Sequence, residues 1–393
     1  MNTFFVDLHI HIGRTPTGKP VKITGSRTLT MENILYEAVH YKGIDIIGVI
    51  DCHVPEVLDH LEEDLQSGRY SELQDGGIRF ENTTLLLGSE LEIYDENCHG
   101  PIHVLVFLPT IHKMRTFSLW CQKYVKNIHL SSQRLYVTGT TLQKKVKELN
   151  GLFIPAHIFT PFKSLYGKGV RFSLTEVFLP ELIDGVELGL SADTEMASYI
   201  AELKRYPFLT NSDAHSLTNI AREYQQMLLK TPSFQEVKYA LKGINGRKVV
   251  ANYGLNPKLG KYYLTFCNTC EKMINHKENS TCPYCGSTSI VKGVLNRICE
   301  LSTHADVYDE RPPYMYQIPL AFIPGIGKKT LAKLLDRFGT EMNVMHRVSF
   351  EELTKIVPEK IATFIVAARE GGLHIEAGGG GVYGKVTRHK DEL

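Results

Sequence analysis

The sequence predicts an α/β barrel of about seven strands, followed by two smaller modules. First, residues 1 to about 255 alternate short apolar runs with helix-like stretches, which is the pattern of strands joined by helices. Second, almost every apolar run leads to His, Asp or Glu, although strand packing does not require these side chains there. In such a barrel the carboxyl ends of the strands meet on one face, where active sites are built. Third, paired cysteines and a glycine-rich turn follow the barrel.

Seven apolar runs are the expected strands, and six of them lead to metal-binding side chains. In order, Phe4–Val6 precedes Asp7, His9 and His11; Ile46–Ile50 precedes Asp51 and His53; Leu85–Leu87 precedes Glu90 and Glu92; Ile102 precedes His103; Phe153–Pro155 precedes His157; and Phe208–Leu209 precedes Asp213 and His215. The seventh run, Gly185–Gly189, contains Glu187. A single histidine is more often a packed or surface residue than a ligand. Six such runs ending at one rim predict a multinuclear metal centre.

Helices are expected between these strands, and a linker closes the barrel. The expected helices are Met31–Lys42, Thr140–Asn150, Thr194–Arg205 and Ser233–Lys242. The segment Asn252–Lys261 is rich in Gly, Asn and Pro, so we place the end of the first domain at residue 255.

The second domain, residues 256–300, is expected to be a zinc module. Two Cys-x-x-Cys pairs lie eleven residues apart in a short polar stretch, which suits a tetrahedral four-thiolate site. A single pair could instead be a redox couple, but two pairs without a thioredoxin-like context favour structural zinc. The predicted zinc ligands are Cys267, Cys270, Cys282 and Cys285.

The third domain, residues 301–393, is expected to be helical and to bind phosphate. Gly325 and Gly327 leave backbone N–H groups open at a helix start, and Lys328 and Lys329 follow directly. An ordinary tight turn between helices is the alternative. A second helical pair is expected at Phe350–Ile356 and Lys360–Ala368, and the run Gly378–Gly381 with the polar tail is expected to be flexible.

The composition is that of a globular protein without a membrane span. The 393 residues are 43% hydrophobic and 22% charged, and no run of about 18 apolar residues occurs. No secretory signal is visible and the eight cysteines do not suggest a disulfide framework, so we expect a reducing cytosol. Net charge is +1, but eight basic residues face one acid between residues 112 and 150. That stretch is either a solvated helical surface or a phosphate-tracking stripe.

The amino-terminal motifs resemble the polymerase-and-histidinol-phosphatase (PHP) family of metal-dependent phosphoesterases. The matching pieces are His9-Ile-His11, Asp51-Cys-His53, Gly88-Ser-Glu90, His103, Pro155-Ala-His157 and Ser212-Asp213-Ala-His215. The resemblance implies a distorted seven-stranded barrel with up to three ions. It also implies one ion on His9, His11, Glu90 and Asp213, a second on Glu90, His103 and His157, and a third on His53 and His215. Many PHP proteins carry a further ligand where this chain has Gly13–Pro16, so either Asp51 or Cys52 substitutes or the third ion is weak or absent.

The carboxyl-terminal segments extend the resemblance to nearly the whole chain. The Gly-Ile-Gly segment resembles the helix-hairpin-helix module, which grips DNA backbone. A PHP barrel followed by a four-cysteine module and this hairpin is the arrangement of the endonuclease Q family. The resemblance implies a DNA repair endonuclease that nicks 5′ of deaminated bases (uracil, hypoxanthine, xanthine) or abasic sites. A PHP-type 3′-exonuclease, a small-molecule phosphoesterase and a non-catalytic DNA-binding scaffold are the alternatives.

The expected chemistry is hydrolysis by metal-activated water. Two or three divalent ions would activate water and polarise the phosphate, and the imidazole-rich ligand set favours zinc over manganese or magnesium. Asp213, Glu90 and Glu187 are the expected catalytic carboxylates, with Asp213 or Glu187 orienting the water. We expect a monomer that acts on DNA at the nucleoid without contacting a membrane, and a sliding clamp is left open as a partner.

A loop after His157 is the expected contact for the DNA strand. Aromatic and basic side chains interleave there, as on surfaces that stack bases and track phosphates, although a surface loop with packed aromatics is equally expected. The expected contacts are Phe162, Lys163, Tyr166, Lys168, Arg171 and Phe172, with Ser191 and Asp193 as second candidates.

Overall fold

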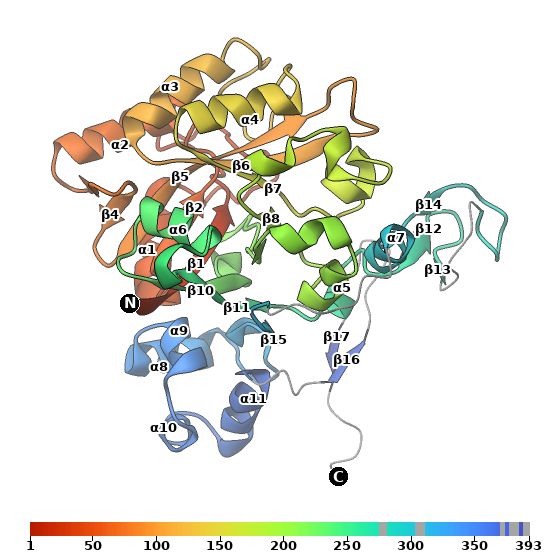
Figure 1. The fold of residues 1–393 in the computed structure, drawn as a ribbon. Helices are drawn as coiled ribbons and strands as arrows, with labels where there is room; N and C mark the ends of the chain where they lie inside the picture. Colours follow the sequence, from red (N-terminus) through yellow and green to blue (C-terminus); the bar gives the residue numbers. More distant parts are fainter. Residues whose placement is uncertain (275–280, 303–310, 370–373, 377–384, 388–393) are drawn as a thin grey trace.

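The structure, a computed structural model, describes residues 1–274, 281–302, 311–369, 374–376 and 385–387 (Figure 1). The predicted flexible run Gly378–Gly381 and the end of the chain lie outside these residues. The fold is mixed α/β, as the sequence predicts, with a barrel-like body, a small cysteine module and a helical domain.

The barrel body contains the strands that the sequence predicts. They are β1 (Asn2–Ile10), β2 (Ile46–Val49), β5 (Thr83–Ile93), β6 (Ile102–Leu108), β7 (Leu152–Pro155), β8 (Val186–Glu187) and β9 (Phe208–Leu209). The pairs β1–β2, β2–β5 and β8–β9 are parallel, whereas β6 is antiparallel to both β5 and β7. The strands are therefore not all parallel, and β6 begins at the rim where its neighbours end.

Backbone hydrogen bonds join these strands in a closed ring. The segment around β8 is joined to that around β7 by Asp184 N–H to Phe153 O at 3.0 Å and Ile158 N–H to Glu187 O at 2.9 Å. Beyond β9, Ala214 N–H donates to His9 O at 3.0 Å, which returns the ring to β1. Closure of the ring brings sequence-distant strand ends onto one rim.

An apolar cluster fills the inside of the ring. It includes Val6, Leu86, Leu105, Phe107 and Ile154, all buried. Two glycines make room for the largest of these side chains, because a Cβ on Gly48 or Gly88 would lie 2.7 or 2.8 Å from the ring of Phe107. The interior below the rim is thus a packed core rather than a channel.

Helices cover the outside of the barrel strands and bury a second, larger apolar layer. They are α1 (Met31–Tyr36), α2 (Pro55–Gln66), α3 (Ile111–Cys121), α4 (Gly139–Glu148) and α5 (Thr194–Ser198). The helix α6 (Phe234–Leu241) instead packs its buried apolar residues into the cluster inside the ring. Two predicted helices differ in detail. The first continues as a π-helix over Glu37–Lys42, and the third breaks after Ser198 and resumes as a 3₁₀ turn over Ala201–Arg205. Ile200, whose backbone is extended, separates the helix that ends at Ser198 from this 3₁₀ turn.

Some of the basic residues between 112 and 150 form ion pairs with nearby carboxylates. Arg115 Nη2 lies 2.7 Å from Asp59 and 2.9 Å from Glu62, and Lys147 pairs with Asp184. These contacts favour the solvated helical surface over a stripe dedicated to phosphate.

Several strands of the main sheet were not predicted. β10 (Tyr224–Leu229) is antiparallel to β1, β11 (Lys248–Gly254) is antiparallel to β10, and β15 (Tyr314–Tyr316) pairs in parallel with β11. At the other edge, β3 (Ser71–Glu72) and β4 (Ile78–Phe80) extend β5. The expected linker therefore begins inside β11, and the chain returns to the barrel sheet after the cysteine module.

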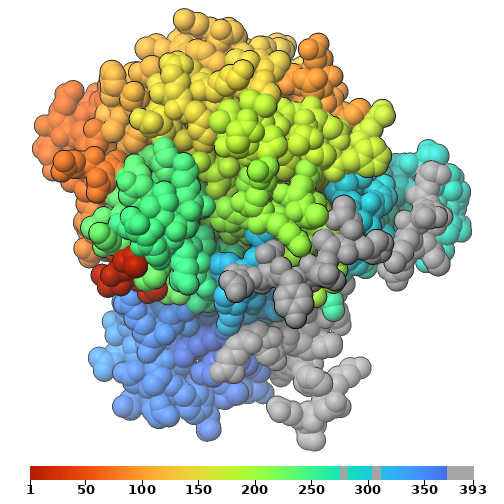
Figure 2. All heavy atoms as spheres, in the orientation of Figure 1, coloured from red at the N-terminus to blue at the C-terminus, as the bar shows by residue number. Residues whose placement is uncertain are grey.

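The cysteine module consists of short strands and one helix. β12 (Thr265–Cys267) pairs with β13 (Met273–Ile274) and β14 (Ile290–Val291), and α7 (Val294–Leu301) follows. Among its described residues, the module's own buried core is Cys267, Ile274 and Cys282. The module projects from the side of the barrel (Figure 2). So small a core cannot stabilise a fold without a metal.

The carboxyl-terminal domain is a group of helices below the barrel (Figure 1). It contains α8 (Lys328–Phe338), α9 (Glu341–His346), α10 (Phe350–Thr354) and α11 (Glu359–Arg369), and beyond them β16 (His374–Glu376) pairs with β17 (Lys385–Thr387). The helices bury an apolar cluster of their own. Among the described residues, every helix is too short or too polar to cross a bilayer.

Candidate metal centre

The predicted ligands come from neighbouring segments at one rim of the barrel. His9 lies near the end of β1, and Ala214 pairs with this strand by two hydrogen bonds, Ala214 N–H to His9 O and His11 N–H to Ala214 O at 3.1 Å. The β5–β6 register places Glu92 opposite His103, and Ala156 N–H donates to His103 O at 3.0 Å. Strands predicted from separate apolar runs thus deliver their imidazoles and carboxylates side by side.

Glu90 lies at the centre of the cluster. Its Oε1 is 2.9 Å from His103 Nδ1, 3.5 Å from His157 Nε2 and 3.6 Å from His9 Nε2. Its Oε2 is 3.6 Å from His11 Nε2. One carboxylate therefore faces four imidazoles, three through Oε1 and one through Oε2.

Asp213 lies on the open side of the cluster. Its Oδ1 is 3.3 Å from His9 Nε2, 3.5 Å from His11 Nε2 and 3.6 Å from His215 Nδ1. The side chain of Asp213 is 36% exposed and that of His215 is 32% exposed, whereas His9 is fully buried. A phosphate group approaching from solvent would meet this side of the centre first.

Apart from the 2.9 Å between Glu90 Oε1 and His103 Nδ1, which is a hydrogen-bond distance, these distances fit donors that share metal ions. Two donors on one tetrahedral zinc, each bound at about 2.0–2.2 Å, stand about 3.4 Å apart, which is longer than a hydrogen bond. His9 Nε2 and His11 Nε2 are buried without a hydrogen-bond partner, although both ring nitrogens of a histidine normally find one. The donor atoms form three overlapping groups, namely His9, His11 and Glu90; Glu90, His103 and His157; and His11, Asp213 and His215. The residues present therefore fit divalent ions.

Hydrogen bonds on the side away from the cluster orient the imidazoles of His9 and His11. Glu187 accepts from His9 Nδ1 at 2.9 Å, and its oxygens also accept from Asn211 Nδ2 at 2.7 Å and His157 N–H at 2.8 Å. Asp51 Oδ2 lies 3.1 Å from His11 Nδ1. A carboxylate on the far nitrogen fixes the tautomer and turns the near nitrogen toward the metal.

The pKa shifts show an excess of negative charge that requires cations. Burial lowers the pKa of His9, but Glu187, Asp213 and Glu90 outweigh it and raise the pKa to about 10. Burial raises the pKa of Glu90, but His103 and Lys22 outweigh it and hold the pKa well below its usual range. Glu90 therefore stays ionised, and a proton on His9 balances negative charge that metal ions would otherwise neutralise.

Backbone strain is concentrated at this rim. His157, Asp213 and Ser132 have φ values of 30°, 46° and 54°, in the left-handed region that residues other than glycine rarely adopt. Gly189 faces the first of these turns, since a Cβ there would lie 3.0 Å from the Cβ of His157. Strain of this kind persists where surrounding structure holds a functional side chain in place.

Four residues considered for the third ion lie in different surroundings. His53 belongs to none of the donor groups found in the described part of the chain; its Nδ1 is 2.8 Å from Ser89 Oγ. Asp51 supports His11, and the Cys52 thiol is fully buried and donates to Val49 O at 3.1 Å. His215 is grouped with His11 and Asp213 instead.

Glu187 lies behind His9. Its side-chain oxygens contact His9, Asn211 and the backbone N–H of His157, and the residue is 1% exposed. This geometry favours orientation of the His9 imidazole over contact with the attacking water.

The loop after His157 is divided between exposed and buried residues. Phe162, Lys163, Lys168, Arg171 and Phe172 are exposed, with Phe172 at 77% and Phe162 packed edge-on against Tyr262. Lys163 pairs with Glu92 at 3.0 Å. Tyr166 is the exception to the expected contact surface, because it is buried and its hydroxyl donates to Glu202 at 2.8 Å.

A cavity of about 210 Å³ adjoins the metal ligands. His157, Glu187, Asn211 and Asp213 form its floor, and its other lining residues are Thr160, Gly189, Leu190, Ser191, Lys261 and Tyr262. Of the two second candidates, Ser191 lines the cavity, whereas Asp193 caps α5 and accepts from Tyr316 at 2.7 Å. The sequence did not single out Lys261, Tyr262 or Asn211, because none of them belongs to a motif.

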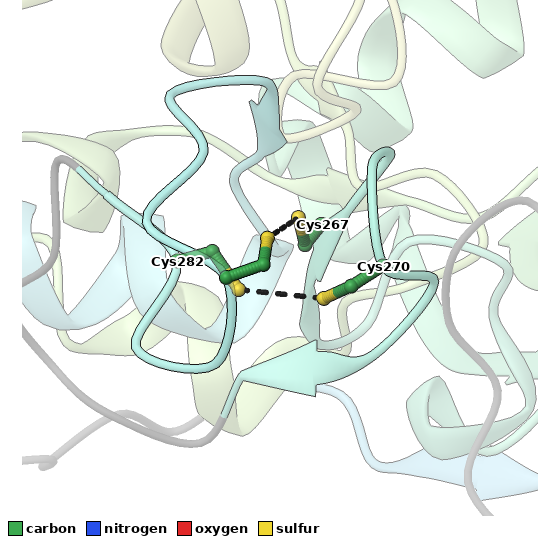
Figure 3. A group of neighbouring side chains, drawn as sticks. Cys267, Cys270 and Cys282 are labelled. Atoms are coloured by element: carbon green, nitrogen blue, oxygen red, sulfur yellow. Dashed lines mark hydrogen bonds between the residues drawn. The ribbon is translucent and has the colours of Figure 1, made fainter.

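The four predicted cysteines of the second module lie together. Figure 3 shows Cys267, Cys270 and Cys282 pointing toward one another. The sulfur of Cys267 is 3.6 Å from that of Cys285, and the sulfur of Cys270 is 3.5 Å from that of Cys282. Backbone N–H groups of Cys270 and Thr269 lower the pKa of the Cys267 thiol to about 6. Such a thiolate set suits one tetrahedral zinc.

The glycine turn precedes α8 as predicted. Gly325 has a φ of 94°, Gly327 is the N-cap without a side-chain cap, and Lys328 and Lys329 are exposed. Residues 308–340 match the family model described as the IMS family HHH motif, of which 308–310 lie outside the described residues. An imidazole-rich centre on the rim of this barrel, together with such a motif, is the arrangement of a metal-dependent hydrolase.

Comparison with known proteins identifies the family. The crystal structure of the lesion-specific endonuclease PfuEndoQ from Pyrococcus furiosus is 32% identical, with a TM-score of 0.85 over 99% of this chain and 96% of that one. A structure of endonuclease Q with a 27-mer duplex substrate and an abasic lesion at the active site is also 32% identical, with a TM-score of 0.84 over 99% and 98%. The chain belongs to the endonuclease Q family of metal-dependent DNA endonucleases.

Two further relatives are uncharacterised proteins. YqxK of Bacillus subtilis is 58% identical over 386 residues, which cover 98% of this chain and all of the relative. MJ0043 of Methanocaldococcus jannaschii is 41% identical over 251 residues, which cover 58% of this chain and 31% of the relative. Family membership therefore rests on the two solved structures, which match along the full length.

Proposed function

We propose that this protein nicks duplex DNA on the 5′ side of a deaminated base (uracil, hypoxanthine or xanthine) or an abasic site. The observation that carries the proposal is the Glu90-centred cluster of imidazoles and carboxylates, in a chain that matches a lesion-specific endonuclease over 99% of its length. The DNA repair role follows from such a substrate.

Two ions in the barrel and one in the cysteine module are the proposed metals. His9, His11, Glu90 and Asp213 would hold the first barrel ion, and Glu90, His103 and His157 the second. His11 has one nitrogen free for a metal, because Asp51 occupies the other, so it cannot serve the first group and the group with His215 together. The imidazoles favour zinc, with manganese or magnesium as alternatives.

The bound ions would supply an activated water and neutralise the phosphoryl oxygens. The chain itself supports this chemistry in three ways. Glu187 and Asp51 hold the rings of His9 and His11, Glu90 joins the two ligand groups, and Asp213 faces the solvent side where water and phosphate arrive. We expect a single-strand nick with 3′-hydroxyl and 5′-phosphate ends.

A lesion pocket is proposed at the cavity beside His157. A flipped base needs a stacking surface and donors to its edge, and the cavity offers Tyr262, Lys261, Ser191 and Asn211. About 210 Å³ is large enough for one nucleobase, which occupies roughly 100–150 Å³ at protein packing density.

Backbone contacts are proposed on either side of this pocket. Lys163, Lys168, Arg171, Phe162 and Phe172 would contact the strand near the metals. Gly325, Gly327, Lys328 and Lys329 would grip phosphates further along the duplex. We expect a monomer acting at the nucleoid, and a sliding clamp remains an open partner.

Cleavage of end-labelled duplexes tests the proposal. Each duplex carries one uracil, hypoxanthine, xanthine or abasic site, and a matched undamaged duplex is the control. We expect one discrete product ending 5′ of the lesion, abolished by a zinc chelator and restored by zinc or manganese. A ladder of products from the 3′ end would instead identify an exonuclease. Hydrolysis of p-nitrophenyl phosphate that survives removal of residues 260–393, with intact damaged duplex, would identify a small-molecule phosphoesterase.

A further inference from the structure

A lysine lies against the carboxylate that joins the two candidate metal sites. Lys22 Nζ is 3.2 Å from Glu90 Oε2 and 2.6 Å from Ser132 Oγ. The Ser132 hydroxyl donates to the same oxygen of Glu90. An ammonium group has three N–H donors, and among the described residues these two oxygens are the acceptors in contact with it. One donor is therefore available for a further acceptor.

The loop between β1 and α1 holds Lys22 in this position. Lys22 N–H donates to Ile12 O at 2.8 Å, Val21 N–H donates to Gly13 O at 3.0 Å, and Ser131 N–H donates to Val21 O at 3.0 Å. The side chain is 15% exposed, whereas that of Lys19 in the same loop is 71% exposed and pairs with Glu56. Lys22 is thus fixed at the rim while Lys19 points to solvent.

The ammonium of Lys22 is charged at neutral pH. A lysine ammonium ordinarily keeps its proton at pH 7, and here Nζ lies 3.2 Å from the Glu90 carboxylate. A cation that is mostly removed from water is retained only where it is paired. The ion pair with Glu90 explains why a charged Lys22 is stable at a mostly buried position. A hydrogen bond from Ser132 could hold Glu90 Oε2 by itself, so positioning this carboxylate does not require the charge of Lys22.

In phosphodiester hydrolysis, a phosphoryl oxygen of the substrate would be the acceptor for the remaining N–H donor of Lys22. Negative charge develops on the phosphoryl oxygens in the transition state, and fixed cations aimed at those oxygens lower the barrier. The side chains of Lys22, Asp213 and His215 are partly exposed, at 15%, 36% and 32%, so solvent reaches each of them.

We propose that Lys22 is a catalytic residue whose ammonium contacts a non-bridging oxygen of the scissile phosphate and stabilises the charge that develops there. This inference rests on the proposed function, because it assigns a further residue to that reaction. It predicts that Lys22 acts on the phosphate rather than on metal retention.

The test compares Lys22→Met and Lys22→Arg with the control Lys19→Met in the zinc-loaded, full-length protein. Three quantities are measured: zinc per chain, the dissociation constant of inorganic phosphate, and the single-turnover rate on an abasic duplex. For Lys22→Met we expect unchanged zinc, phosphate affinity about 10-fold weaker and a cleavage rate about 100-fold lower, the loss typical for one transition-state donor. Lys22→Arg should recover part of the rate, and Lys19→Met should match the wild type.

Two results would overturn the assignment. Phosphate affinity and rate equal to the wild type would remove Lys22 from the reaction. Loss of zinc in proportion to activity would make Lys22 a positioning residue for Glu90.

The same variants are also compared on bis(p-nitrophenyl) phosphate. Wild-type hydrolysis of this diester without nicking of damaged DNA would refute the proposed substrate, while the phosphate affinities would still decide the role of Lys22.

Discussion

At the scale of single residues, the two ring nitrogens of His9 differ in what they face, and so do those of His11. His9 presents Nε2 to the cluster and gives Nδ1 to Glu187, and His11 presents Nε2 and gives Nδ1 to Asp51. The carboxylate behind the ring sets which nitrogen carries the proton and how strongly the other binds a metal. Ligand identity alone therefore does not describe this centre.

Replacing Glu187 with glutamine tests the outer hydrogen bonds. Glu187→Gln keeps the size of the side chain but removes the charge that holds His9 Nδ1–H. Loss of such a partner typically costs 10–100-fold in metal affinity or activity, so we expect a loss in this range with the fold retained. Zinc competition with a chromogenic chelator measures the affinity, and circular dichroism checks the fold.

The matched control is Glu181→Gln, an exposed carboxylate in the same part of the chain. It should leave zinc affinity unchanged. Equal affinities for wild type and Glu187→Gln would mean that packing, rather than the charge of Glu187, orients His9.

Residue patterns in the sequence identified most of the side chains that cluster at the rim, but not what each of them contacts. His9, His11, Glu90, His103, His157, Asp213 and His215 were all singled out from the ends of apolar runs, and the structure groups them. His53 looked equivalent in sequence, yet its ring bonds Ser89 inside the body. Lys22 and Ser132 carry no motif, because they reach the centre through loops whose course depends on tertiary contacts.

At the scale of elements, strand direction decides how the rim is assembled. The sequence indicated which runs are strands, but β6 is antiparallel, so His103 lies at the beginning of its strand rather than at the end. Apolar content identifies a buried strand without giving its direction, which is fixed by pairing partners far along the chain. The strands β10 and β15 were missed because glutamine and tyrosine interrupt their apolar pattern.

The cysteine module should fold only with zinc. Its own core consists of three of the residues that the structure describes, and a four-thiolate zinc supplies the free energy that so small a core lacks. Cys282→Ser is expected to lose one zinc per chain and to weaken duplex binding, while hydrolysis of bis(p-nitrophenyl) phosphate by the barrel persists. Zinc analysis and fluorescence anisotropy with a labelled duplex measure the two effects.

Cys299→Ser is the control for that experiment, because Cys299 is an exposed cysteine on α7 outside the cluster. It should retain both zinc and duplex affinity. Retention of zinc by Cys282→Ser would contradict the four-thiolate assignment.

The turn before α8 should bind DNA through phosphate alone. Lys328 and Lys329 are exposed beside open N–H groups at the helix start. Replacing both with alanine should weaken binding equally for damaged and undamaged duplexes and reduce the slope of log affinity against log salt by about 1 per lysine. Lys355→Ala, an exposed lysine outside this turn, is the control. A loss confined to damaged DNA would instead assign these lysines to lesion recognition.

At the scale of the whole molecule, the helical domain is docked on the barrel by specific contacts. Lys42 Nζ lies 2.8 Å from Glu341 in a largely buried ion pair, and Thr340 packs so closely that a Cβ on Gly43 would lie 2.4 Å from its hydroxyl. His346 of α9 packs against Phe5 with ring centroids 4.6 Å apart. A fixed distance between the metal centre and the glycine turn follows from this docking, which suits gripping one duplex at two places.

Protonation of His346 should weaken this docking. Its ring also contacts Tyr224 and Tyr253, and Tyr224 Oη lies 2.6 Å from Nε2. Burial lowers the pKa of His346 to about 4, with Arg369 and Arg347 adding to the shift. Between pH 6.5 and about 4 the unfolded chain binds a proton at His346 that the folded chain does not, so stability falls as the pH falls through this window.

Comparison of His346→Gln with the wild type isolates this contribution. The shift from 6.5 to about 4 corresponds to at most about 3 kcal/mol, present in full above pH 6.5 and lost toward pH 4. Glutamine keeps a partner for Tyr224 but does not titrate, so the difference in unfolding free energy between the two proteins should shrink on acidification. Urea unfolding at pH 7.5, 6, 5 and 4.5 measures it, with exposed His60→Gln as the control. A difference that stays constant with pH would mean that His346 is not held neutral by its burial between the domains.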